Sequence, residues 1–190
     1  METTTIDSTA VRSAALKNGL IWGVISVVLF LVYYYIAPEL LSSWIGSTIT
    51  FLVGIGLAVF FTLDLRKRAG GYWSFSQALL NIFIMFLVST AVSYIFTIIF
   101  GKYLEPGYVG TMKEIIMAGT ESTFKSIGME ASQLEKNMSN MSAELDKTLN
   151  PDFSQMVVGF GISATLYFIG ALIFAAIFKK ERPIFFKTEE

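Results

Sequence analysis

The sequence of 190 residues contains neither cysteine nor histidine. Disulfide bonds, thiol nucleophiles and metal sites built from these two side chains are therefore excluded, and so is the usual proton carrier near neutral pH. No other catalytic, cofactor or metal motif is recognisable in the sequence. We therefore expect a protein that is not an enzyme and that has no catalytic residues, no metal site and no cofactor.

Charged residues are also scarce, at 15% of the chain against 54% hydrophobic residues. They leave four stretches without Asp, Glu, Lys or Arg: residues 19–37, 44–63, 75–100 and 153–178. A helix of about 20 apolar residues crosses the hydrocarbon core of a bilayer. The sequence predicts an all-α protein with one domain, an integral membrane bundle of four transmembrane helices. The lipid bilayer is its first expected partner, and nucleic acid is not one.

Two of these helices carry start signals. Ser74 is followed three residues later by Gln77, which predicts a capping box at the third span. Asn150 and Pro151 predict the N-terminus of the fourth span, because proline is favoured at the first helical position. Trp73, beside the third span, is expected in the aromatic belt at the membrane interface.

Positively charged residues are unevenly divided between the two sides of the predicted bundle. Four spans place both termini on one side, and nine of the fourteen Lys and Arg residues fall there. These are Arg12, Lys17, Arg66, Lys67, Arg68, Lys179, Lys180, Arg182 and Lys187. Because positive segments beside a span resist translocation, we expect this side, with both termini, to be cytoplasmic.

Residues 101–152, between the third and fourth spans, are expected outside the cytoplasm and carry eight acidic residues against five lysines. Residues 111–149 lack proline, and apolar side chains recur there at heptad spacing, which indicates helix. The candidate interaction seam consists of Phe124, Ile127, Leu134, Met138, Met141 and Leu145. One helix and a hairpin both fit the pattern. The seam packs within this protein or against the membrane face, or it binds a second copy or another membrane protein.

A row of polar or small side chains recurs at intervals of four along the third span. It consists of Gln77, Asn81, Ser89, Ser93 and Thr97, with Met85 among them. Side chains at this spacing form one inclined ridge, which should face protein. Close helix packing is the first interpretation, and a polar pathway lined by the ridge is the alternative.

Small residues four apart occur on the other three spans as well. The pairs are Gly19 and Gly23, Gly54 and Ala58, Gly159 and Ser163, and Ala171 and Ala175. Such pairs let helices approach closely within a bilayer, so together they favour a compact bundle over four independent anchors.

The loop after the second span contains Arg66, Lys67 and Arg68. These three side chains are candidate contacts for anionic lipid headgroups, each contributing about 1 kcal/mol near a charged leaflet. The alternative is an ordinary topology signal with no specific lipid, since headgroup-binding clusters usually hold more than three basic residues.

The four-span layout, this basic loop and the long segment before the last span accompany a short sequence of glycine and aromatic residues, residues 70–78 (GGYWSFSQA). In these features the chain resembles the bacterial DUF4199 family, whose members are membrane proteins of unknown function. The resemblance implies a bacterial inner-membrane protein and transfers no catalytic or binding residue. The two glycines are explained equally well by a flexible turn before the capping box.

Two functions are compatible with the sequence. The first is a non-enzymatic structural or interaction protein of the inner membrane, with the acidic helical segment as the part that faces a partner. The second is a small permease or channel subunit. No ionisable side chain other than tyrosine lies within the four charge-free stretches, and ion-coupled transporters usually bury one, so the first function is favoured.

Overall fold

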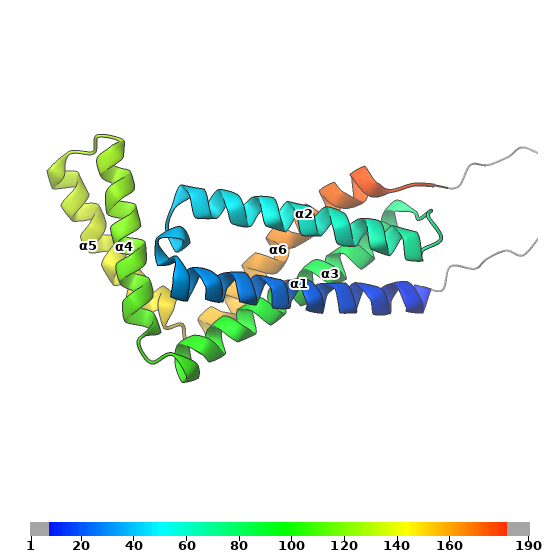
Figure 1. Cartoon of the computed structure of the whole chain (residues 1–190), viewed down its shortest axis with the longest axis horizontal. Coiled ribbons are helices and arrows are strands. Elements are labelled where there is room, and N and C mark those ends of the chain that lie inside the picture. The colour runs from blue at the N-terminus through cyan, green and yellow to red at the C-terminus, as the bar shows by residue number, and fades with distance from the viewer. Residues whose placement is uncertain (1–7, 182–190) are drawn as a thin grey trace, which may run out of the picture.

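The computed structural model describes residues 8–181, which form six α-helices and two short helical turns (Figure 1). In chain order they are α1 (Ser8–Ile36), the 3-10 turn η1 (Pro38–Leu41), α2 (Trp44–Arg68), α3 (Phe75–Ile99), the π-helical turn η2 (Phe100–Leu104), α4 (Tyr108–Ser126), α5 (Ala131–Leu149) and α6 (Phe153–Phe178). Four of them, α1, α2, α3 with η2, and α6, are long and apolar enough to cross a membrane. The expected all-α bundle with four spanning helices is confirmed.

Two helices extend beyond the charge-free stretches at the end where the termini lie. Helix α1 begins at Ser8 rather than at Gly19, and α2 continues past Leu63 to Arg68. The extensions form because their apolar side chains pack together in one buried cluster, which includes Val11 of α1 and Leu65 of α2. Absence of charge therefore marks lipid depth, whereas protein packing decides where the helix ends.

The predicted capping box at the third span is present. Ser74 Oγ accepts a hydrogen bond from the Gln77 backbone N–H at 3.3 Å, and Gln77 Oε1 accepts one from the Ser74 N–H at 3.0 Å. For the fourth span the predicted cap was wrong. Asp152 caps α6 instead of Asn150, because its carboxylate forms a second capping box with Gln155.

Helix α3 occupies the centre of the bundle, between α1 and α6. On one side Gly19 of α1 lies against its backbone, where an added Cβ would be 2.7 Å from the Met85 carbonyl oxygen and 2.8 Å from Val88 Cβ. On the other side Ala171 and Ala175 of α6 are completely buried. Small residues thus let both neighbouring helices approach α3 closely, as expected from their spacing.

The remaining two helices form the hairpin that the heptad pattern left open. Helices α4 and α5 pair at the end of the bundle opposite the start of α1 and the end of α6 (Figure 1). The turn between them contains Gly128 at φ +76°, a left-handed conformation that glycine adopts without strain. An ion pair of 2.6 Å between Lys113 Nζ and Asp146 Oδ1 joins the two helices. Helix α4 continues through Gly119 without a break. The missing side chain at Gly119 leaves room for Ser42 of the loop after η1.

We predict that Gly19→Ala destabilises the protein by about 1 to 3 kcal/mol, because the new methyl group would force α1 away from α3. The matched control is Gly161→Ala in α6, where an added Cβ meets no atom within 4 Å. That control should be neutral or slightly stabilising, since alanine is the better helix former. Reversible unfolding in mixed micelles, followed by circular dichroism, measures both free energies. Equal values for the two variants would show that the α1 and α3 backbones are not in close contact.

Candidate functional site

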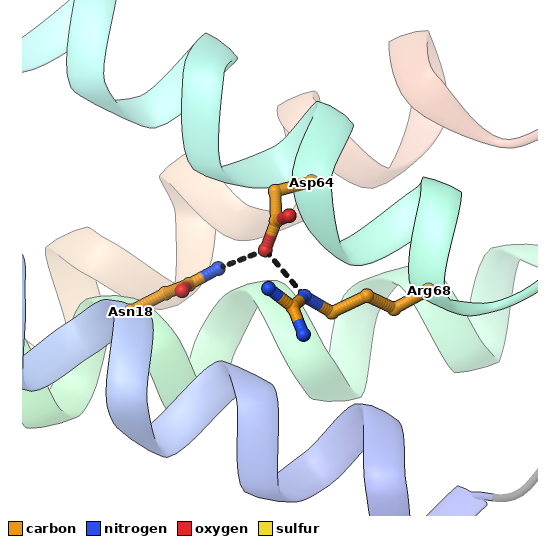
Figure 2. Close-up of polar contacts among 3 residues, drawn as sticks. All are labelled: Asn18, Asp64 and Arg68. Atoms are coloured by element: carbon orange, nitrogen blue, oxygen red, sulfur yellow. Dashed lines mark hydrogen bonds and ion pairs between the residues drawn. The ribbon is translucent and has the colours of Figure 1, made fainter.

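A polar cluster lies where α1 and α2 meet near the terminal end of the bundle (Figure 2). Asn18 Nδ2 donates a hydrogen bond of 2.9 Å to Asp64 Oδ2, and Arg68 Nε donates one of 2.7 Å to the same oxygen. Asn18 is buried, whereas the side chains of Asp64 and Arg68 are 28% and 56% exposed. A buried amide on one helix is therefore satisfied by a carboxylate on the next.

The chemistry of this cluster is that of a clamp between two helices. Asp64 has its charge balanced by Arg68 one turn further along the same helix, so it can serve Asn18 without being left unpaired. Within residues 8–181, no group of three or more His, Cys, Asp or Glu side chains is placed to hold a metal ion.

The same contacts change the interpretation of the three candidate lipid-headgroup residues. Arg68 points to Asp64 and forms an ion pair, so its guanidinium already has a partner within the protein. Arg66 is half-buried and Lys67 is exposed. The structure therefore divides the basic triplet, and Lys67 is the member most accessible to a headgroup.

Three side chains of the ridge on α3 donate hydrogen bonds within their own helix, whereas the buried Asn81 Oδ1 has no hydrogen-bond partner among the described residues. Asn81 donates to the Gln77 carbonyl at 2.8 Å, Ser93 to the Ser89 carbonyl at 3.2 Å and Thr97 to the Ser93 carbonyl at 3.0 Å. Asn81 and Ser89 are buried, Ser93 and Thr97 are half-buried, and Gln77 is exposed in the capping box. Hydrogen bonds to the carbonyl four residues earlier leave few polar groups to line a pathway.

The face of the ridge that meets α1 is a packing surface. Met85 is completely buried, and its carbonyl oxygen lies against Gly19. One turn further on, the Ser89 carbonyl and Val92 lie against Gly23, where an added Cβ would be 2.6 Å from Val92 Cβ. The ridge and the first small-residue pair thus meet at one helix crossing.

The candidate seam lies mainly inside the hairpin. Phe124, Leu134, Met138, Met141 and Leu145 are half-buried, and Ile127 is 69% exposed because it follows the last residue of α4. The base of the hairpin is fixed by Tyr108, which packs against Tyr34 and Phe100. Burial there raises the pKa of the Tyr108 hydroxyl, with the neighbouring Tyr34 adding to the effect, so this group is neutral at physiological pH.

A cavity that sequence analysis did not predict lies between α1 and α2, with its floor on α3 and α6. Its volume is about 760 Å³. The walls hold the side chains Trp22, Leu29 and Tyr33 of α1, Thr50 and Leu57 of α2, and Phe86, Tyr167 and Phe174 of α3 and α6. No Asp, Glu, Lys or Arg lines it. Gly54 was predicted to form a helix-packing pair with Ala58. An added Cβ at Gly54 would instead meet no atom within 4 Å, because the residue faces the cavity.

The glycine and aromatic sequence before α3 connects α2 to α3 and contacts the end of α6. Gly70 and Gly71 have φ values of +80° and +82°, and the chain then pairs with the end of α6. Trp73 exchanges two backbone hydrogen bonds with Lys180, of 2.9 and 3.2 Å, and its indole N–H donates to the Phe178 carbonyl at 2.9 Å. Trp73 is 2% exposed, so it packs inside the protein rather than in the expected interfacial belt.

A comparison with protein families matches residues 17–180 to the family described as protein of unknown function (DUF4199). The chain belongs to the DUF4199 family. In this DUF4199 protein the match covers α1 from residue 17 onward, all of α2, α3 and α6, and the hairpin between α3 and α6. Comparisons with curated proteins and with solved structures find no match.

We predict that Asp64→Leu lowers the free energy of unfolding by about 1 to 3 kcal/mol, because the buried Asn18 amide loses its acceptor. Arg68→Leu should cost less than about 1 kcal/mol, since an exposed ion pair contributes little. Chemical unfolding of both variants in detergent micelles gives the two values. A larger loss for Arg68→Leu would mean that the ion pair, and not the hydrogen bond to Asn18, stabilises this corner of the bundle.

Proposed function

We propose that this DUF4199 protein is a non-enzymatic structural or interaction protein of the bacterial inner membrane, and that its α4–α5 hairpin meets a partner outside the cytoplasm. The observation that carries the proposal is the way the hairpin is built. Its apolar residues turn toward each other, its base is fixed to the bundle, and α5 packs chiefly against α4. One full side of α5 therefore remains exposed in a fixed position.

The segment between α3 and α6 is acidic overall, with eight acidic residues against five lysines in residues 101–152. On α5, Glu135, Lys136, Glu144 and Lys147 are exposed, Asp146 pairs with Lys113 of α4, and Glu130 precedes the helix. A surface of this kind favours a partner with a basic face, because complementary charge raises the association rate and disfavours other partners. The partner we infer is another membrane protein, or a second copy that presents its own lysines.

The proposed orientation follows from the distribution of positive charge. Lys67 and Lys179 lie at the end of the bundle that holds the described ends of α1 and α6, and the hairpin lies at the other end (Figure 1). Arg182 and Lys187, which belong to the same basic set, lie outside the described residues. Positive segments beside spans remain in the cytoplasm, which supports a hairpin on the outer side.

We propose no enzymatic role, which is supported by the lack of histidine and cysteine and by Asp64, whose carboxylate is held by two partners. A small permease or channel subunit is the alternative. It is disfavoured because the polar ridge of α3 packs against α1 and the cavity of about 760 Å³ has no charged wall. Solute-specific flux into proteoliposomes, abolished by bulky substitutions between Asn81 and Thr97, would favour this alternative instead.

The first prediction from this proposal concerns orientation, and the absence of native cysteine makes it accessible to single introduced thiols. Ser139 in α5 and Glu181 after α6 are both exposed. In intact spheroplasts a membrane-impermeant maleimide should label Ser139→Cys and should label Glu181→Cys only after lysis. Labelling of Glu181→Cys in intact cells, with Ser139→Cys protected, would invert the orientation.

The second prediction concerns the partner. Crosslinking in native membranes, followed by quantitative mass spectrometry, should identify a protein whose yield falls when Glu135→Lys and Glu144→Lys are combined. The matched control is Glu39→Lys, an exposed acid on η1 at the same end of the bundle, which should leave that yield unchanged. If no crosslinked protein distinguishes the double variant from the control, the exposed side of α5 is not an interaction surface.

A further inference from the structure

Helix α2 is held close to the bundle only at its two ends. Its buried residues are Gly46 near the start and, after a gap of almost three turns, Ala58, Phe61, Thr62 and Leu65. Residues 47–57 between them are exposed or half-buried. The middle of α2 therefore stands away from α1 and α6.

Close contacts lie on both sides of this stretch of α2. At the start Ser43 caps the helix by accepting from the Gly46 N–H at 3.0 Å, and Gly46 lies against the Leu40 backbone so closely that no side chain fits. At the far end Phe61 stacks on Trp22, with 6.3 Å between ring centroids. Helix α2 cannot close the gap without losing one of these contacts.

The gap is the cavity of about 760 Å³ described above, a size typical of small-molecule sites. The lining is mostly apolar, so water inside the cavity would find few hydrogen-bond partners. An empty cavity, however, deprives its lining atoms of dispersion contacts on one side. An apolar occupant satisfies both conditions, and charged or strongly polar solutes do not.

The position of the cavity identifies the occupant. It lies between helices that cross the membrane, so the surrounding solvent is hydrocarbon. From Gly46 to Ala58, both in its wall, α2 rises about 18 Å at 1.5 Å per residue. One leaflet of the hydrocarbon core is about 15 Å deep, half of about 30 Å. The cavity thus matches the length of one acyl chain of the leaflet on the η1 side.

We propose that a phospholipid inserts one acyl chain into this cavity and remains bound there as a ligand of the protein. Tyr33 lines the cavity one turn before the end of α1, and its buried hydroxyl has no hydrogen-bond partner among the described residues. A chain that enters from the η1 side places its ester linkage near this depth. The ring of Tyr33 contacts the chain at this depth, while its hydroxyl is buried away from the cavity.

Two glycines of α2 provide a matched test. An added Cβ meets no atom within 4 Å at Gly54, which lines the cavity, or at Gly56, which does not. Native mass spectrometry of the protein purified from phosphatidylethanolamine and phosphatidylglycerol membranes should show one retained phospholipid on the wild type. Gly54→Phe should reduce the lipid-bound fraction about tenfold, because the ring occupies part of the space that the acyl chain needs. Gly56→Phe should leave the lipid-bound fraction unchanged.

Circular dichroism checks that each variant is folded, and Thr50→Phe, one turn earlier in the same wall, replaces Gly54→Phe if that variant is not. Tyr33→Phe, which keeps the ring and removes the hydroxyl, should lower phospholipid retention less than Gly54→Phe does. Equal retention in Gly54→Phe and Gly56→Phe would overturn the proposal. So would a wild type that carries only detergent, or a dimer that Gly54→Phe dissociates, which would make a second copy the occupant.

Discussion

The contact on which the rest of this structure depends is the close approach of α1 to α3 at Gly19 and Gly23. Lipid tails are as apolar as the side chains, so helices in a bilayer associate through close packing rather than through a hydrophobic driving force. Glycine and alanine surfaces allow it between α1 and α3 and between α3 and α6, where Ala171 and Ala175 are buried. Helix α2 has such contacts only near its ends, and a cavity remains along its middle.

The features that the sequence predicts are those that local chemistry determines. The length of the charge-free stretches predicts four spans, and the structure has four helices of that kind. The Ser74 and Gln77 pair predicts a capping box because both partners lie within one turn. Membership of the DUF4199 family was also recognisable from the sequence, because residues 70–78 and the four-span layout are visible without a structure. The heptad pattern of residues 111–149 correctly indicates helix.

The features that the sequence does not predict depend on which helix meets which. Asn18 and Asp64 are 46 residues apart, and nothing in the chain pairs them before α1 and α2 are placed side by side. Trp73 is of a residue type that favours the membrane interface, yet its backbone pairs with Lys180 and its side chain is buried. The cavity is the feature that the sequence predicts least well, because it arises where α2 lacks contacts with its neighbours. A small residue such as Gly54 fits a packed helix and an empty space equally well.

Occupation of that cavity by an acyl chain is measured most directly with the native tryptophans. Trp22 lines the cavity and is 9% exposed, Trp44 is 80% exposed, and Trp73 is 2% exposed and lies away from the cavity. In nanodiscs, nuclear Overhauser spectra detect cross-peaks between acyl methylene protons and each indole ring. Our account predicts lipid cross-peaks at Trp22 and Trp44 and none at Trp73. Lipid cross-peaks at Trp44 alone would contradict it.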